Sequence, residues 1–238
     1  MATITWRFTE NQFANATRGS FKKMLTFCAD HDAKLFGRQG EADILPLYTR
    51  FHPQYLAYSS AYAVWQASRG SYAGGTDAMQ QKLEELESVK ARQWDVKVQT
   101  VFDKGTPQYT AIFPNGRAPF QSGTMDQQIS AVETLHEQMV VAGAALPAAL
   151  VTEVGDYHTT LVTLRTAQQA KEGAADDGST FLETTRVATA ALLYGNLGLL
   201  MDIYRETPDR ITDFYELSII RRKADEDEEE DPVPPPVV

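Results

Sequence analysis

The chain has 238 residues, 43% of them hydrophobic, which is enough to bury a sizeable core. Its 22 basic and 32 acidic side chains give a formal net charge of -10, and consecutive carboxylates at residues 225–231 supply much of the acidic excess. The other charges nearly balance, so the sequence has no broad basic face for phosphates, and we expect no nucleic-acid or acidic-membrane partner. Cys28 is the only cysteine, which excludes an intramolecular disulfide and cysteine-rich zinc sites.

Neither a signal peptide nor a membrane-spanning helix is expected. The first eight residues lack the basic and continuous apolar regions of a signal peptide. Residues 187–201 are uncharged and mostly apolar but too few to cross a bilayer roughly 30 Å thick, so a buried helix is predicted there. The sequence predicts cytoplasmic synthesis without membrane insertion, and it leaves open incorporation into a particle or export by a signal-independent route.

Both ends of the predicted folded body alternate apolar and polar residues. The alternation lies at residues 4–8, within an N-terminal extension (1–17), and at residues 215–219. This pattern is typical of short strands with one apolar face. We predict two strands that pair as a small sheet, or that each extend a strand of a neighbouring molecule.

Between the ends, residues 18–222 are predicted to form a mainly α-helical bundle. Its six predicted helices cover residues 18–36, 44–68, 77–102, 125–142, 147–171 and 180–205, and four long ones form the bundle. Pro46 and Pro147 mark helix starts because proline in the first turn sacrifices no intrahelical hydrogen bond. Pro53 either kinks the second helix or marks its true start. Capping-box patterns predict further starts at Thr124 and Thr180.

Several landmarks recur at a fixed distance along the chain. The pairs Leu45-Pro46 and Thr106-Pro107 reappear 101 residues later as Leu-Pro at 146–147 and Thr-Pro at 207–208. Glycine-rich segments at 70–75 and 173–178 look like helix breaks. We therefore predict two similar helical hairpins, at about 44–105 and 146–206, joined by a crossover at 106–124. Two explanations account for the offset: an ancient duplication, or independent use of the same helix-start and turn residues in two helical hairpins.

Four aromatic residues follow helical spacing in the first hairpin: Tyr55, Tyr58, Tyr62 and Trp65. Such a row could form a platform that stacks on a sugar, a base or a partner helix. Large aromatics on one helical face more commonly pack into a core or an oligomer interface, and we favour that interpretation.

The crossover holds the most distinctive local segment, residues 113–124. Asn115-Gly116 suits a turn with positive φ, and two prolines stiffen its flanks. Arg117 could bind a carboxylate or phosphate, but one arginine without a glycine-rich anion cradle is a weak signal. We predict a structural crossover with Phe120 as its anchor.

The same segment carries a resemblance. Its Asn-Gly-Arg-x-Pro-Phe-Gln-Ser-Gly-Thr sequence, together with Arg-Gln-Trp-Asp at residues 92–95, resembles uncharacterised helical proteins of Bacteroidetes-type bacteria over about residues 20–220. The resemblance implies a helical fold, and it implies no activity, cofactor or catalytic residue.

No convergent set of catalytic residues is visible. The four histidines, at 31, 52, 136 and 158, are scattered and belong to no zinc-protease or nucleophile-elbow motif. The acidic residues at 84, 85 and 87 lack the Glu-x-x-His partners of a di-iron bundle. We predict no cofactor and no metal, and whether the chain is an enzyme stays open, with a non-enzymatic role favoured.

The tail, residues 223–238, combines carboxylates with a proline-rich end and cannot form a core. It is either a solubilising tail or a tethered peptide whose Pro234 to Val238 end docks into an apolar groove. Long helices, aromatic surfaces and terminal extensions predict a structural or interaction protein, in an oligomer or a larger bacterial or phage assembly. The alternative is a ligand-binding protein or enzyme with a pocket between the hairpins, lined by the tyrosines, Arg92 and His158.

Overall fold

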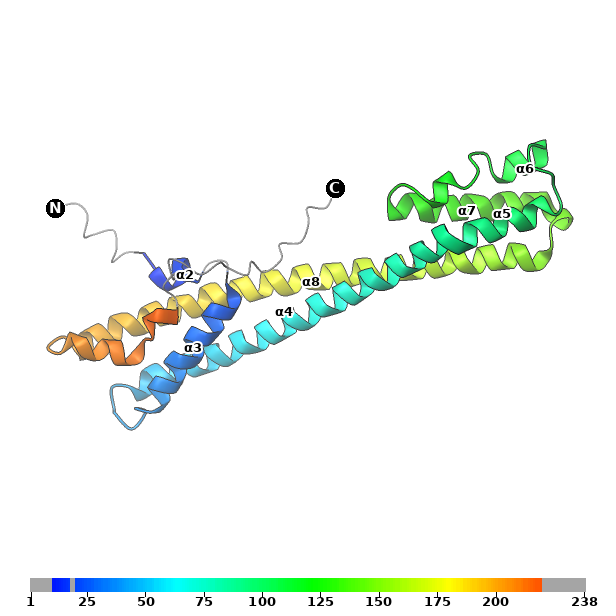
Figure 1. Cartoon of the computed structure of the whole chain (residues 1–238). Helices are drawn as coiled ribbons and strands as arrows, with labels where there is room; N and C mark the ends of the chain where they lie inside the picture. The colour runs from blue at the N-terminus through cyan, green and yellow to red at the C-terminus, as the bar shows by residue number, and fades with distance from the viewer. Residues whose placement is uncertain (1–9, 18–19, 220–238) are drawn as a thin grey trace, which may run out of the picture. The chain divides into compact units, whose positions relative to one another are not determined.

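The structure is a computed structural model, and it describes residues 10–17 and 20–219. This part of the chain is mainly helical (Figure 1). The longer elements are α2 (Gln12–Ala16), α3 (Phe21–Phe36), α4 (Leu45–Glu85), the π-helix η1 (Leu86–Lys90), α5 (Ala91–Gln99), α6 (Pro107–Ile112), α7 (Met125–Ala142) and α8 (Ala148–Ile203). Short 3-10 helices are η2 (Ala118–Phe120), η3 (Gly143–Ala145), η4 (Pro208–Phe214) and η5 (Leu217–Ile219).

The chain divides into two compact units. The described part of unit 1 comprises residues 10–17, 20–64 and 179–219, and unit 2 comprises Trp65–Gly178. Helices α4 and α8 each contribute one part to unit 1 and the other part to unit 2. Unit 2 is therefore continuous in sequence, whereas unit 1 is assembled from segments that lie before and after it.

The predicted helix breaks at residues 70–75 and 173–178 are wrong, because α4 and α8 run through them without interruption. Two of these glycines instead lie where the helices approach each other. A Cβ added to Gly75 would lie 3.0 Å from Cδ of Lys171, and one added to Gly178 would lie 3.2 Å from Oγ of Ser68. Close helix approach offsets the poor helix propensity of glycine. The two-hairpin arrangement, which depended on these breaks, is not confirmed.

Each unit contains the same kinds of parts, and the Thr-Pro turns of the two units are 101 residues apart in sequence. Unit 1 has a short helix α3, the start of a proline-led long helix, the end of the other long helix, and a Thr-Pro turn that ends at buried Phe214. Unit 2 has α7, the start of α8, the end of the α4–α5 run, and a Thr-Pro turn that ends at buried Phe113. This correspondence is consistent with a duplicated chain whose halves have exchanged their second parts.

Several predicted starts agree with the structure. Helix α7 covers the predicted residues 125–142, and both hydrogen bonds of its capping box form between Thr124 and Gln127. Of the two Thr-Pro pairs, Thr106 caps α6 by accepting from the Tyr109 amide, whereas Thr207 makes no side-chain capping bond at the start of η4. By contrast, Thr180 lies inside α8 and begins no helix, and Pro53 lies inside α4.

The predicted sheet is not confirmed. Residues 217–219 form η5, and the described residues contain no strand. Within the N-terminal extension, residues 12–16 form α2, while the alternating residues 4–8 lie outside the described part. At the C-terminal side, Tyr215 is held by packing on Phe13 and Phe27 with ring centroids 5.3 and 6.0 Å apart, so side-chain burial overrides local alternation.

Both units have apolar cores. The unit 2 core joins α4, α5, α6, α7 and α8, and Trp94 is its largest fully buried side chain. The unit 1 core joins α3, α4, α8 and η4, and its largest fully buried side chains are Tyr58, Phe27, Phe51 and Phe214.

Candidate interaction surface

Unit 1 is organised around an antiparallel pair formed by the first part of α4 and the last part of α8. The Gln54 side-chain amide donates to Thr189 Oγ1 at 3.1 Å, and Arg50 Nη2 donates to Asn196 Oδ1 at 3.3 Å. A Cβ added to Gly195 would lie 2.8 Å from Arg50 Nη2, so glycine gives the guanidinium its room.

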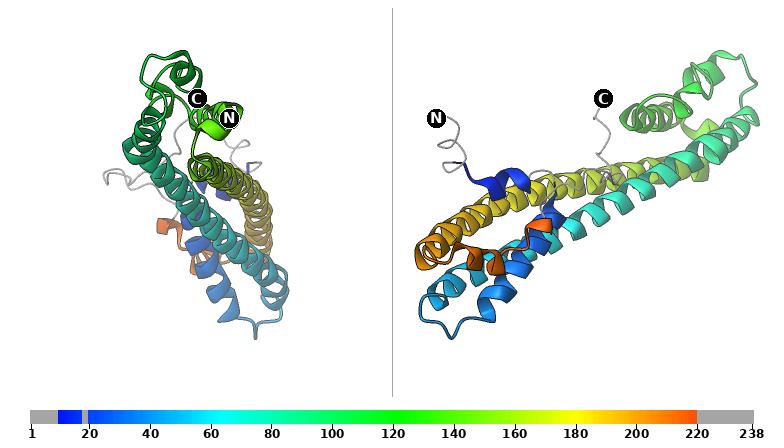
Figure 2. Two further views of the ribbon diagram at one scale, coloured as in Figure 1. Left: turned by 90° about the vertical axis from the view of Figure 1, so that its right-hand side faces the viewer. Right: turned by 60° about the vertical axis from the view of Figure 1, so that its left-hand side comes forward.

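One side of this pair is covered by other parts of unit 1, and Figure 2 shows α3 and η4 lying together against it. Tyr58 Oη donates to the Phe21 carbonyl at 2.9 Å. Tyr215 Oη donates to the Leu193 carbonyl at 3.0 Å. Arg186 Nη1 donates to the Ala14 carbonyl at 2.9 Å, which holds α2 on the same side.

The opposite side of the pair carries one stripe of helically spaced residues on each helix. With 3.6 residues per turn, positions three and four residues beyond a contact residue flank it on opposite sides. On α4, Tyr58 is four residues beyond Gln54 and lies on the covered side, so Ala57, three residues beyond Gln54, lies on the opposite side. On α8, Leu193 lies on the covered side in the same way, so Leu192 lies on the opposite side. We call the resulting set the uncharged face: Pro53, Ala57, Ser60 and Val64 of α4, and Phe181, Ala188, Leu192 and Leu199 of α8.

This face is solvent-exposed and carries no formal charge. Phe181 is 61% exposed, Val64 58% and Leu199 44%. Residues 51–68 contain no Asp, Glu, Lys or Arg, and neither do residues 187–201. The prediction that the second run is a buried helix is therefore only half correct, because Val187, Ala188, Ala191, Leu199 and Met201 are exposed. Contiguous exposed apolar surface of this kind is typical of interaction sites.

The α8 segment in unit 2 provides an internal comparison. Its exposed positions between residues 152 and 170 are dominated by polar side chains, including Thr152, Asp156, Thr159, Thr160, Thr163, Thr166 and Gln169. Four of these threonines donate to a carbonyl one turn earlier in the helix. A long solvent-facing helix in this chain thus tolerates polar residues readily, so the apolar face of unit 1 is a local property.

A buried polar chain lies beneath the covered side of unit 1. Asn196 donates to His31 Nε2 at 3.2 Å, and His31 Nδ1 donates to the Phe214 carbonyl at 2.9 Å. These bonds fix a neutral imidazole. Burial lowers the pKa of His31 to about 4, although the Phe214 carbonyl and Asp30 act in the opposite direction. His31 has no exposed surface, so its role is structural.

Unit 2 contains two polar clusters that hold helices together. Glu153 of α8 accepts from Lys97 at 2.7 Å, Lys90 at 3.1 Å and the Trp94 indole at 3.3 Å. The bond from Lys97 is the largest cause that lowers the pKa of Glu153 to about 2. Nearby, Asp95 accepts from Tyr109 Oη at 2.8 Å, and burial raises the pKa of Tyr109 to about 12.

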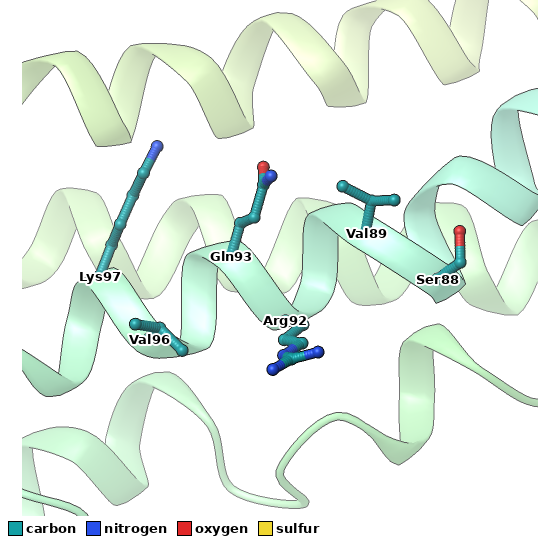
Figure 3. Close-up of a pocket in the computed structure, with 6 residues that line it drawn as sticks. All are labelled: Ser88, Val89, Arg92, Gln93, Val96 and Lys97. Atoms are coloured by element: carbon teal, nitrogen blue, oxygen red, sulfur yellow. The ribbon is translucent and has the colours of Figure 1, made fainter.

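A shallow pocket of about 640 Å³ lies on the surface of η1 and α5. Its lining residues are Ser88, Val89, Arg92, Gln93, Val96 and Lys97. Figure 3 shows Val89, Gln93 and Lys97 on one side of the helix and Arg92 on the other, so these side chains do not converge on one reacting point. Arg92 lines this surface pocket, but the pocket is not the one predicted between the hairpins, since neither the tyrosines nor His158 line it.

The four predicted aromatics do not form one exposed platform. Tyr58 is fully buried, and Tyr55, Tyr62 and Trp65 are half-buried. Packing therefore explains Tyr58 best, and Arg69 lies over the Trp65 ring at 5.0 Å.

The crossover residues have structural partners. Phe120 is 4% exposed and packs edge-on against Phe113 with centroids 6.1 Å apart, in agreement with its predicted anchor role. Arg117 Nε lies 3.6 Å from Asp95 Oδ2, so its closest acidic group belongs to the chain itself. Pro234 and Val238 lie outside the described residues.

No family model, curated protein or solved structure matches the chain significantly. Over residues 10–17 and 20–219, no group of three or more His, Cys, Asp or Glu side chains is placed to hold a metal ion. Nor is any described helix long and apolar enough to cross a membrane.

Sequence reasoning missed the uncharged face because it took the α4 and α8 segments separately. The available signal was the joint absence of charge from residues 51–68 and 187–201. Antiparallel pairing brings these two runs together in unit 1, as the Gln54–Thr189 bond shows. A charge-free run on one helix is consistent with burial, but two paired runs with exposed side chains make this face a candidate interaction surface.

Proposed function

We propose that this chain is a non-enzymatic structural or interaction protein that acts within an oligomer or a larger assembly. The observation that carries the proposal is the uncharged face of unit 1, where seven of the eight positions expose apolar or small side chains and Leu192 is half-buried. When a partner removes exposed Phe and Val side chains from water, the free energy of association falls by about 25 cal/mol per Å² of apolar surface buried.

The alternative of a ligand-binding protein or enzyme has weaker support. Its expected pocket would gather titratable groups around a substrate. His31 is buried, and the His52 ring nitrogen contacts Asp32 at 3.0 Å on the surface of α3 and α4. The residues that line the α5 pocket point to both sides of one helix.

Light scattering on the purified chain across a concentration series tests the proposal. We expect a discrete oligomer or a mass that grows with concentration, and the same behaviour from a chain ending at residue 222. A strictly monomeric chain that also retains no protein partner from a cell lysate would contradict the proposed function.

A further inference from the structure

We propose that a second copy of this chain covers the uncharged face, and that the two copies pair through it about a twofold axis. This inference rests on the proposed structural or interaction role and deepens it by naming the partner. Three properties of the face carry it: its charge, its shape and its size.

Charge favours a second copy over a partner recognised by ion pairs. Each copy has a formal net charge of -10, so two copies repel unless they meet where charges are absent. The face has no charged side chain of its own, and Arg50 at its edge is held by Asn196. In a twofold dimer the same surface patch of each copy meets its equivalent on the other copy. Because this patch is apolar, pairing it with itself leaves no buried charge without a partner.

The shape of the face suits helix packing across such an axis. In each stripe the residues follow one another at intervals of three, four or seven, as do the contact residues of helical bundles. Each stripe contains both small and larger residues, such as Ala57 and Val64 on α4 and Ala188 and Phe181 on α8. Two antiparallel pairs placed face to face give a four-helix arrangement with short, interlocking contacts.

The size of the face predicts a reversible dimer. From Pro53 to Val64 the α4 stripe is about 17 Å long, and from Phe181 to Leu199 the α8 stripe is about 27 Å long, at 1.5 Å per residue. Two helices about 10 Å wide then project an area of about 450 Å². This is smaller than the roughly 800 Å² per partner of a standard interface, so the pairing is expected to be weak and reversible. We expect a dissociation constant in the micromolar range.

Sedimentation equilibrium from about 1 µM to about 1 mM tests the pairing. The Val64→Glu/Phe181→Glu double variant places two carboxylates on the face, and burial of unpaired charge should weaken the dimer by at least about 100-fold. The matched control is Val141→Glu, which adds a carboxylate at an 81% exposed valine in unit 2 and should leave the dimer unchanged. Circular dichroism establishes that all three proteins keep their helices.

Cysteine trapping gives a second measurement that does not depend on destabilising the interface. The native Cys28 is fully buried, and burial together with Asp32 raises the pKa of its thiol, so it is unreactive in the folded chain. Under oxidised glutathione, Ala188→Cys should form a covalent dimer, whereas Ala144→Cys, on an exposed turn of unit 2, should not. The trapped dimer should disappear when Val64→Glu is added.

The outcomes separate this inference from the proposed function. If the face and control variants dissociate at the same concentration as the wild type, the pairing surface is wrong although the chain is still an oligomer. A wild type that is monomeric at about 1 mM overturns the inference, while the proposed function then depends on whether another protein binds. Loss of the dimer in the face variant alone, with trapping at residue 188, supports the inference.

Discussion

At the scale of single residues, the buried polar groups have clear structural roles. His31 connects α3 to α8 and to the end of η4 through its two ring nitrogens. Its neutral form is required because protonation would turn Nε2 from an acceptor into a donor facing the Asn196 amide. The cost of that change should appear as a pH-dependent stability.

We predict that His31 destabilises the fold as the pH falls from 6.5 to 4. The folded-state pKa of about 4 is below the ordinary value of 6.5, so in this window the unfolded chain binds a proton that the folded chain does not. The accumulated loss is about 3 kcal/mol in the free energy of unfolding.

Urea unfolding of wild type and His31→Asn at several pH values measures this effect. The variant should be less stable at pH 7, and the difference should shrink toward pH 4, because only the wild type carries the His31 penalty. The half-exposed His158→Asn is the control. Parallel pH dependences of wild type and His31→Asn over this window would contradict the assignment.

Glu153→Gln should destabilise unit 2 by about 1–2 kcal/mol at pH 7, since a neutral amide accepts more weakly from two lysines and an indole. The folded-state pKa of about 2 lies below the usual 4.5, so the stabilisation is present above pH 4.5 and is lost as the pH falls toward 2. Thermal unfolding at pH 7 and pH 3 measures it. The exposed Glu137→Gln serves as control, and equal losses in both variants would refute the prediction.

At the scale of elements, helical glycines occur in two structural settings, close helix contact and open space, which the sequence does not distinguish. Gly75 and Gly178 lie at close helix approaches, whereas a Cβ at Gly74 or Gly173 would meet nothing within 4 Å. All four lie within continuous helices. The sequence shows where the glycines are, but only the position of the facing helix shows whether a given glycine lies at a close helix contact.

Alanine substitutions distinguish continuous helices from breaks. At Gly74 and Gly173, alanine should raise the free energy of unfolding by about 0.5–1 kcal/mol each, because it restricts the unfolded chain without a clash. At Gly75 the gain should be smaller or absent, because the Lys171 side chain must shift. Denaturant titration measures all three, and destabilisation by Gly74→Ala or Gly173→Ala would argue for the breaks.

The sequence-based predictions agreed with the structure where neighbouring residues alone determine it, as at helix starts. Helix α7 was predicted at both ends because Thr124 and Gln127 form a self-contained cap, and the starts at Pro46 and Pro147 agree to within a residue. Topology could not be predicted in this way. Whether α4 pairs with its own continuation or with α8 depends on contacts such as Gln54–Thr189, which are 135 residues apart.

At the scale of the whole molecule, the uneven charge distribution is the dominant property. The chain has a formal net charge of -10, yet the uncharged face of unit 1 carries none of it. Association through that surface is opposed by the charge on the remainder of each copy and favoured by removal of apolar groups from water.

Salt should therefore strengthen self-association. Raising the ionic strength from about 0.01 M to about 1 M shortens the Debye length from about 30 Å to about 3 Å and screens the repulsion between acidic copies. We expect the dissociation constant from sedimentation to fall several-fold. A dissociation constant that rises steeply with salt would indicate instead that ion pairs hold the copies together.

The divided composition of unit 1 has a consequence for synthesis on the ribosome. Residues 20–64 emerge before all of unit 2, while their partner segment, 179–219, emerges after it. At about 5–20 residues per second, the 114 residues between them delay that partner by roughly 6–23 s. During this interval α3 and the start of α4 carry Phe51 and Tyr58 without their α8 cover. A chain released at residue 178 would therefore contain all of unit 2 but would lack the segment that completes the core of unit 1.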